Sequence, residues 1–365
     1  MSEFKNLPSG WKVVKLEKVA PLQRGYDLPT DNIKEGLYPV VYSNGILRFH
    51  NEFKAKGPGV ITGRSGTIGK VVYVEEDYWP HNTSLWVTNF YDNNPKFIYY
   101  MYINLNLARF SAGSGVPTLN RNDIHAQTIP LPPLDEQEKI AEILSTWDEA
   151  INLTINLIES KKQFKKALMQ NLLTAKIRFP QFKEKWKEIK LGEICEIQTG
   201  KLNANAMIQG GRYKFFTCAK EVFEIDDYAF DTEAILVSGN GENVGYIHYF
   251  NGKFNAYQRT YVLDKFTENI LFIKYFLEFA LKRKIEIEKK DGNTPYIVLS
   301  TIFGFIVKLP NLKEQQKIAE VLTACDDEIN LLNLKLENLK KQKQGLMQKL
   351  LSGKVIVWLK NIASC

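Results

Sequence analysis

Leu131-Pro-Pro-Leu-Asp-Glu-Gln-Glu-Lys-Ile-Ala-Glu-Ile-Leu144 occurs twice in this chain of 365 residues. The second copy is Leu309-Pro-Asn-Leu-Lys-Glu-Gln-Gln-Lys-Ile-Ala-Glu-Val-Leu322, with ten of fourteen positions identical at an offset of 178 residues. Unrelated segments of this length would share about one identity by chance. The sequence LMQNLL at 168–173 returns as LMQKLL at 346–351, at the same offset. The chain is therefore a duplicated half-molecule rather than an array of short repeats.

Each copy of this motif opens a long segment with the periodicity of a paired helix. Side chains recur at alternating steps of four and three residues, the pattern of a coiled-coil seam. Prolines precede each segment and none interrupts it, so the pattern predicts helices over 135–175 and 313–352. The predicted apolar interface consists of Ile140, Leu144, Trp147, Ile151, Ile158, Leu168, Leu172, Ile318, Leu322, Ile329, Leu332, Leu336, Leu339, Leu346 and Leu350. The same seam includes Thr154, Lys161, Lys165, Cys325 and Lys343.

A single apolar stripe is also typical of one helix face buried in a globular core. Two stripes in equal phase favour a helix pair instead. Only the short segment 176–183 joins the first helix to the second half of the chain, and the ends of a domain often lie close together. We therefore expect the second helix to run back antiparallel to the first.

The segments in front of the two helices share landmarks. The opening Trp11–Leu16 matches Trp186–Leu191, and each segment has a glycine-rich turn, Gly63–Lys70 in the first and Ser238–Gly245 in the second. Short β-branched runs flank these turns and predict strands. Each segment is thus expected to form a compact α/β (α+β) domain. Outside the landmarks the two domains share little, so the framework is duplicated and the contents differ.

These patterns divide the chain into five parts. The predicted parts are a first globular domain at 1–133, a first helix at 134–176, a second globular domain at 177–311, a second helix at 312–353 and a tail at 354–365. The expected architecture is a pseudo-two-fold pair of globular heads joined by a rod of two antiparallel helices.

Composition sets broad limits on function. The net charge of +7 mildly favours a polyanionic partner. The four cysteines lie far apart and the four histidines show no metal-ligand spacing, so we expect free thiols, a reducing compartment and no metal site. We find no signal-peptide pattern and no apolar run of membrane-spanning length, and we predict a cytoplasmic protein.

The glycine-rich turn Gly63–Lys70 departs from a nucleotide-binding phosphate loop. Five residues separate Gly63 from Gly69, and Val71 follows Lys70 where a magnesium-binding hydroxyl is required. A hairpin turn and a DNA-contacting loop remain as alternatives, and Arg64 with Lys70 favours the second because arginine suits guanine or phosphate. The proline motifs lack the flanking residues of an amino-methyltransferase site, and no catalytic residue is predicted.

Polar and basic side chains in the loops are the candidates for contact with DNA. Asn, Gln, Arg, Ser and Thr read base edges and phosphates, although the same residue types also fill ordinary loops. The candidates in the first half are Arg24, Tyr26, Ser43, Asn44, Arg64, Ser65, Lys70, Thr118 and Arg121. Those in the second half are Lys201, Thr217, Lys220, Asn240, Tyr257, Gln258, Arg259 and Asn293.

The combined pattern resembles the specificity subunit of bacterial type I restriction-modification systems. The resemblance is carried by the Leu-Pro-x-Leu-x-Glu-Gln-x-x-Ile-Ala motifs at 131–141 and 309–319. The Trp-Lys-x-x-Lys-Leu openings and the Arg-Phe-Pro-x-Phe link at 178–182 also fit. It covers about residues 1–353, nearly the whole chain.

This resemblance implies two target recognition domains, each of which reads one half of a split DNA sequence. It implies that the helix pair sets the spacer and docks two modification subunits, which are adenine methyltransferases. Restriction subunits, with endonuclease and translocase activity, complete the assembly. S-adenosylmethionine, ATP and magnesium would be cofactors of those partners, in a bacterial or archaeal cytoplasm, and none would bind this non-catalytic chain.

Three alternatives make different predictions. A coiled-coil scaffold with two protein-binding heads would bind partners without DNA affinity. A stand-alone nuclease or methyltransferase would be active alone with its cofactor. A sequence-blind DNA binder would show steep salt dependence without discrimination between sequences, and the divergent loops on matched frameworks argue against it.

Overall fold

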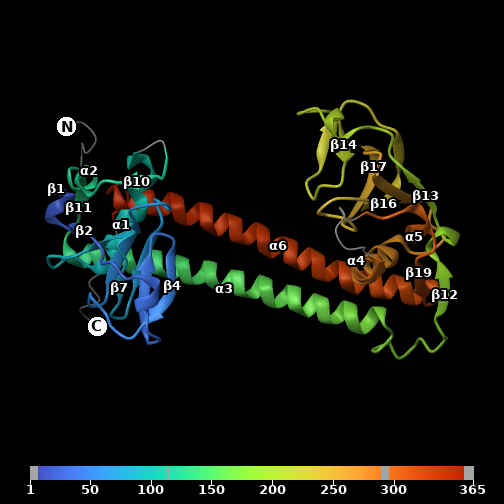
Figure 1. Cartoon of the computed structure of the whole chain (residues 1–365), viewed down its shortest axis with the longest axis horizontal. Helices are drawn as coiled ribbons and strands as arrows, with labels where there is room; N and C mark the ends of the chain where they lie inside the picture. The colour runs from blue at the N-terminus through green and yellow to red at the C-terminus, as the bar shows by residue number, and fades with distance from the viewer. Residues whose placement is uncertain (1–6, 113–114, 289–295, 357–365) are drawn as a thin grey trace, which may run out of the picture. The chain divides into compact units, whose positions relative to one another are not determined.

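The computed structural model describes residues 7–112, 115–288 and 296–356 (Figure 1). The chain forms two compact units, and the predicted duplicated α+β fold with two long helices is confirmed. Unit 1 contains Met1–Ile155 and Leu334–Cys365, and unit 2 contains Asn156–Asn333. Both places where the chain passes from one unit to the other lie inside the long helices, α3 (Leu134–Leu173) and α6 (Leu312–Leu351).

Unit 1 contains the first domain, which is mostly β-structure. Its strands are β1 (Lys12–Lys15), β2 (Leu22–Arg24), β3 (Tyr38–Tyr42), β4 (Gly45–His50), β5 (Gly59–Gly63), β6 (Val71–Val74), β7 (Trp79–Pro80), β8 (Ser84–Val87), β9 (Ser111–Ala112), β10 (Thr118–Leu119) and β11 (Thr128–Leu131). Its helices are α1 (Pro95–Asn104) and α2 (Arg121–His125), with 3-10 turns η1 (Leu16–Lys18), η2 (Thr30–Asn32) and η3 (Leu107–Phe110). The two larger sheets have the strand orders β2-β8-β5-β6 and β4-β3-β7.

Unit 2 contains the second domain, which is built around one larger sheet. Its strands are β12 (Lys187–Lys190), β13 (Glu196–Thr199), β14 (Tyr213–Phe216), β15 (Phe223–Ile225), β16 (Phe230–Ser238), β17 (Ile247–Ala256), β18 (Thr260–Asp264) and β19 (Ile306–Leu309). Its helices are α4 (Ile270–Glu288) and α5 (Leu299–Phe303), with 3-10 turns η4 (Leu191–Glu193) and η5 (Ala204–Ala206). The sheet order is β13-β18-β16-β17-β14-β15.

The sequence landmarks form the same substructure in both domains. The Trp-Lys opening becomes a strand that pairs antiparallel with the strand leading into the proline motif. Lys12 pairs with Leu131 in β1–β11, and Lys187 pairs with Leu309 in β12–β19. The duplicated motif therefore marks the point where each domain joins its long helix.

The glutamine of the duplicated motif fastens the start of each long helix to its domain. Gln137 is 2% exposed, and its amide donates to the Pro132 carbonyl at 3.0 Å and accepts from the Asn94 backbone N–H at 3.0 Å. Asn94 is the N-cap of α1, accepting from the Phe97 N–H at 2.9 Å. In unit 2, Gln315 makes the corresponding bonds to Pro310 and Asn269. A buried amide with satisfied donors and acceptors holds these two helices together at low cost.

The core of each domain takes apolar side chains from the beginning of one long helix and the end of the other. In unit 1, Ile140 and Leu144 of α3 pack in one cluster with Leu350 of α6. In unit 2, Leu172 of α3 packs with Leu322 of α6. The two helices are thus antiparallel, as predicted. All fifteen predicted apolar interface residues, each within the described part of the chain, are buried or partly buried.

Two lysines in the seam are neutralised in the same way in the two units. Lys343 pairs with Asp148, whose other oxygen accepts from the Tyr100 hydroxyl at 2.7 Å. The Lys343 ammonium also lies 5.1 Å from the centre of the Tyr100 ring. In unit 2, Lys165, Asp326 and Tyr275 repeat this arrangement. Partnered charges at seam positions favour this helix alignment over shifted ones.

Among the described residues, no helix has both the length and the hydrophobicity required to cross a bilayer.

Candidate nucleic-acid interface

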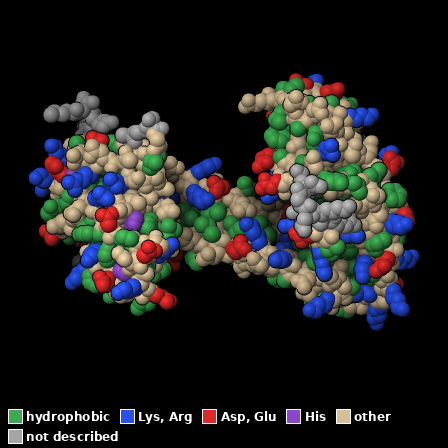
Figure 2. Space-filling view, in the orientation of Figure 1, with side chains coloured by type: hydrophobic (Ala, Val, Ile, Leu, Met, Phe, Trp, Pro, Cys, Tyr) green, Lys and Arg blue, Asp and Glu red, His purple; other side chains and the backbone are tan. Residues whose placement is uncertain are grey.

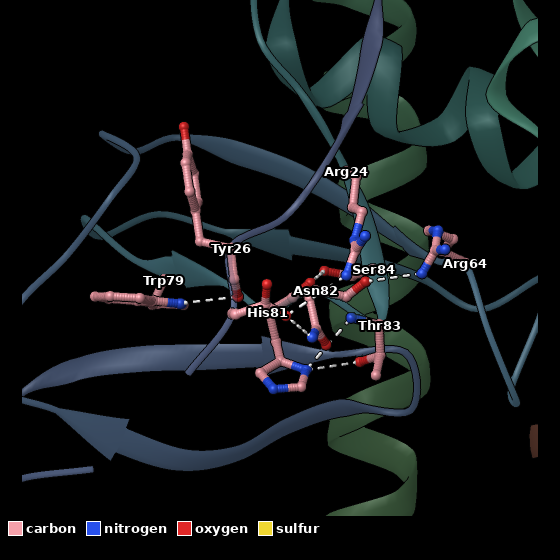
Figure 3. A network of polar contacts seen from close by, with 9 residues as sticks. Arg24, Tyr26, Arg64, Trp79, His81, Asn82, Thr83 and Ser84 are labelled. Atoms are coloured by element: carbon pink, nitrogen blue, oxygen red, sulfur yellow. Dashed lines mark hydrogen bonds and ion pairs between the residues drawn. The ribbon is translucent and has the colours of Figure 1, made fainter. Parts of the chain in front are cut away.

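A cleft of about 390 Å³ in unit 1 collects four of the predicted DNA-contacting residues. It is lined by Arg24, Arg64, Leu85, Thr118, Leu119, Asn120 and Arg121, and we name it the first cleft. The arginines come from three places: the end of β2, the residue after β5 and the start of α2. Figure 3 shows Arg24 and Arg64 beside the turn that contains Asn82 and Ser84.

The backbone of Arg64 is fixed from both sides. Its N–H donates to the Thr83 carbonyl at 2.9 Å, and its carbonyl accepts from the Leu119 N–H at 2.8 Å. Its guanidinium donates to the Asn82 carbonyl at 3.1 Å (Figure 3). The bond to Leu119 also places β10, and with it Thr118, against the loop that follows β5.

A close backbone contact positions Arg24 and Tyr26. A side chain on Gly25 would put its Cβ 2.3 Å from the His81 carbonyl oxygen, so only glycine fits between the two segments. The Tyr26 N–H donates to the Pro80 carbonyl at 2.8 Å, and Arg24 lies 3.5 Å from the Asp27 carboxylate. Tyr26 is 37% exposed next to the first cleft, although it is not among the residues that line it.

The glycine-rich turn Gly63–Lys70 is the hairpin between β5 and β6, whose pairing closes at Thr62 and Val71. Lys70 donates to the Asn44 carbonyl at 2.6 Å, and the Ser43 N–H donates to the Thr83 hydroxyl at 3.3 Å. The hairpin turn and the predicted candidates Ser43, Asn44 and Lys70 therefore lie together. Ser65, the residue after Arg64, bridges to Thr118.

The histidines near the first cleft are part of its scaffold. Burial lowers the pKa of His81, whose ring bonds the Thr83 hydroxyl at 3.0 Å. Burial, together with the positive charge of Arg121, lowers the pKa of His125, whose Nε2 accepts from the Leu22 N–H at 2.8 Å. Both rings are neutral at neutral pH and hold backbone in place. Within the described residues, no group of three or more His, Cys, Asp or Glu side chains could hold a metal ion.

Unit 2 has a corresponding cleft of about 270 Å³, which we name the second cleft. It is lined by Thr199, Gly239, Gln258, Arg259, Tyr261 and Ile297. The Gly239 N–H donates to the Arg259 carbonyl at 2.8 Å, and the Gly239 carbonyl accepts from the Ile297 N–H at 2.8 Å. These are the two bonds that Arg64 makes in unit 1. The sequence offset of 175 residues likewise pairs Arg64 with Gly239 and Arg24 with Thr199.

The other predicted residues of the second half surround the second cleft unevenly. Asn240 bridges to Tyr296 next to it, and the Tyr257 N–H donates to the Phe216 carbonyl at 2.9 Å. Lys201 and Lys220 are exposed. Thr217 is only 5% exposed, and its hydroxyl accepts from the Ala219 N–H at 3.1 Å, so it shapes the turn rather than presenting a surface group. Asn293 lies outside the described residues.

Some lining residues gave no sequence signal. Tyr261 and Ile297 sit in apolar stretches typical of a core, yet the Tyr261 hydroxyl donates to the Ile297 carbonyl at 2.8 Å at the wall of the second cleft. Leu85 and Leu119 similarly line the first cleft. Only an alignment of the two halves across the offset could have suggested them. Figure 2 shows basic side chains scattered among acidic and polar ones on the face in view, so charge alone does not mark the site there.

The chain is similar to known proteins along most of its length. Residues 8–160 and 183–341 match the family model of the type I restriction modification DNA specificity domain. The type I restriction enzyme EcoDI specificity subunit of Escherichia coli is 38% identical over 174 residues, which are 47% of this chain and 38% of that protein. The type I restriction enzyme MjaVIII specificity subunit of Methanocaldococcus jannaschii is 25% identical over 288 residues, which are 67% of this chain and 66% of that protein.

The matched segments thus make up less than two thirds of these two relatives. Among solved structures, the crystal structure of the type I restriction-modification system S subunit from M. genitalium matches with a TM-score of 0.68 and 19% identity. The match covers 96% of this chain and 99% of that one. At this identity the match supports the fold.

Proposed function

The chain belongs to the family of type I restriction modification DNA specificity domains, and from this premise we propose that it is the DNA-recognition subunit of a type I restriction-modification complex. Each globular domain reads one half of a bipartite DNA site. The alternatives of a protein-binding scaffold and a sequence-blind DNA binder give way to this function because of the paired clefts.

The observation that carries the proposal is one cleft geometry with two different linings. The same two backbone hydrogen bonds shape both clefts, through Arg64 in unit 1 and Gly239 in unit 2. The first cleft has three arginines, whereas the second has Gln258, Arg259 and Thr199. Amide, hydroxyl and guanidinium groups are the groups that read base edges. A shared frame with different donors and acceptors suits two different half-sites.

The helix pair is proposed to set the spacing between the half-sites and to dock two modification subunits. Its support is that the chain passes between the units only within the continuous helices α3 and α6. Methyl transfer and cleavage would be performed by the modification and restriction subunits, with S-adenosylmethionine, ATP and magnesium as their cofactors. The contribution of this chain would be to choose the DNA sequence.

Lengthening the helix pair tests the spacing role. One heptad inserted after Ile155 in α3 and another after Asn333 in α6 would keep the seam in register and add about 10 Å of helix. We expect both half-sites to be kept and the unread spacer to grow by about three base pairs, since each pair rises 3.4 Å. An unchanged spacer in a methylated, assembled complex would contradict this role.

A map of modified adenines tests the proposed function directly. The chain is expressed with the methyltransferase encoded beside it, in a host without other adenine methylation. We expect a single split motif. Replacing residues 1–133 with the corresponding domain of another family member should change one half of the motif and leave the other half intact. A stable complex that methylates no site, or methylates without sequence preference, would overturn the proposal.

A further inference from the structure

The first cleft concentrates positive charge without a matching acid in its walls. Arg24, Arg64 and Arg121 all line it, and none of its described lining residues is Asp or Glu. Three guanidinium groups around one cleft repel one another, which disfavours the empty site relative to a site filled by an acceptor-rich ligand. The second cleft has one arginine, Arg259. The charge therefore belongs to the lining of the first cleft and not to the shared framework.

The three arginines are held to different degrees. Arg64 is half-buried, its backbone is bonded on both sides and its guanidinium is anchored on the Asn82 carbonyl. Arg24 and Arg121 are exposed, and Arg24 has a single long contact of 3.5 Å to Asp27. Base recognition requires a side chain held in a fixed position, whereas phosphate contacts tolerate mobile ones.

The donor geometry of a fixed arginine matches one base in particular. A guanidinium has five N–H donors in one plane, and the bond to Asn82 uses one of the Arg64 nitrogens. Two of the remaining donors can reach O6 and N7 of guanine together, which is the commonest specific contact between an arginine and DNA. We propose that Arg64 reads a guanine in the half-site of the first domain, with Arg24 and Arg121 on the flanking phosphates. This inference rests on the proposed function.

The second domain cannot make the same contact from the equivalent position. Gly239 occupies the place of Arg64, and a Cβ there would lie 2.4 Å from the Arg259 carbonyl oxygen. An arginine at this position would require the backbone to move. The guanine contact is therefore specific to the half-site that the first domain reads, and the second half-site is read from Gln258 and Arg259 on the neighbouring wall.

The test compares methylation maps of the intact complex carrying single substitutions. Arg64→Gln should reduce the preference for guanine at one position of the first half-site by about ten-fold or more and leave the second half-site unchanged. Arg24→Gln and Arg121→Gln should lower modification at all sites evenly, and each should reduce the salt dependence of DNA affinity by about one in the log–log slope. Arg48→Gln, an exposed arginine on β4 outside the first cleft, is the matched control and should change nothing.

Two results would overturn the inference while leaving the proposed function intact. One is a wild-type first half-site, identified by replacement of residues 1–133, that contains no G·C pair. The other is an Arg64→Gln map in which all sites decline evenly, since that marks a phosphate contact. If Arg64→Gln fails to assemble with the methyltransferase, Arg64→Lys keeps the charge but loses the planar pair of donors, and it should lose the same guanine preference. No methylation by the wild-type complex would instead refute the proposed function.

Discussion

The first cleft has three arginines and the second has one, although the same pair of backbone hydrogen bonds shapes both. The junctions between domains and helices show the opposite behaviour. Gln137 and Gln315 make matching bonds, and so do the seam lysines Lys343 and Lys165. The junction residues are buried between elements that must pack, whereas the cleft residues face solvent. Packing thus constrains the framework and leaves the linings free to differ.

One buried position in the junctions departs from this rule. Glu136 of unit 1 accepts from the Trp11 indole at 2.8 Å. Its counterpart Glu314, 1% exposed, instead binds the Arg178 guanidinium with two bonds of 2.9 and 2.7 Å. The indole of Trp186, the counterpart of Trp11, has no hydrogen-bond partner among the described residues. The same carboxylate is therefore satisfied by a neutral donor in one unit and by a charged one in the other.

The largest effect expected from this difference is that of Arg178→Ala. It leaves the buried Glu314 carboxylate without its charged partner, and we expect unit 2 to lose about 3 kcal/mol of stability. Urea denaturation followed by hydrogen exchange in each unit measures this. Unit 1 should be unaffected, because Arg178 belongs to unit 2.

Two tryptophan substitutions provide the matched controls. Trp11→Phe removes the donor to Glu136 and should destabilise unit 1 by about 1–2 kcal/mol. Trp186→Phe removes an unpartnered indole N–H and should be nearly neutral. Equal losses from the two tryptophan substitutions would show that packing of the rings, and not the bond to the glutamate, sets their contribution.

The sequence predicted the framework well. The helices predicted over 135–175 and 313–352 end within two residues of Leu134–Leu173 and Leu312–Leu351. Long periodic stripes of this kind leave little competition between structures. The duplication also exposed the landmarks on which the domains are built, because unrelated contents did not repeat.

The sequence was less informative about the candidate site. It singled out Arg24, Arg64 and Arg121 by residue type, but their convergence depends on bonds such as that from Leu119 to Arg64, 55 positions apart. Thr217 had the same polar character and is buried in a turn. The direction of a loop side chain is decided by long-range contacts that residue type does not encode.

A smaller effect is expected at the seam lysines, where the two networks have different reserves. Beside Asp326, unit 2 has Lys274 at 3.8 Å as well as Lys165. Unit 1 has Tyr99 at the position of Lys274, so Asp148 depends on Lys343. Lys343→Met should therefore cost about 1–2 kcal/mol, and Lys165→Met less than about 1 kcal/mol.

Thermal unfolding of the two variants, followed by exchange in each unit, checks this ranking. The double change Lys165→Met with Lys274→Met removes the reserve and should bring the loss in unit 2 up to that of Lys343→Met. A Lys165→Met variant as unstable as Lys343→Met would show that Lys274 does not compensate at 3.8 Å.

The smallest expected difference is in the response to acid. Burial lowers the pKa of His81 and His125 in unit 1 and of His248 in unit 2. A histidine with a lowered folded-state pKa loses its contribution to stability as the pH falls through its unfolded value, near 6.5. In unit 2, burial raises the pKa of Asp264, and the contribution of that carboxyl grows as the pH falls. Between about pH 7 and pH 5, unit 1 should lose more stability than unit 2.

Hydrogen exchange in β5 and β16, corrected for the intrinsic effect of pH, compares the two units under the same conditions. His125→Gln isolates the cause, because glutamine offers the Leu22 N–H an acceptor and does not titrate. This variant should reduce the acid sensitivity of unit 1 and leave that of unit 2 unchanged. If unit 1 keeps its full acid sensitivity in His125→Gln, the proton responsible binds elsewhere, and His81 is the next residue to replace. Equal losses in the two wild-type units would contradict the prediction itself, since two buried histidines would then respond no more than one.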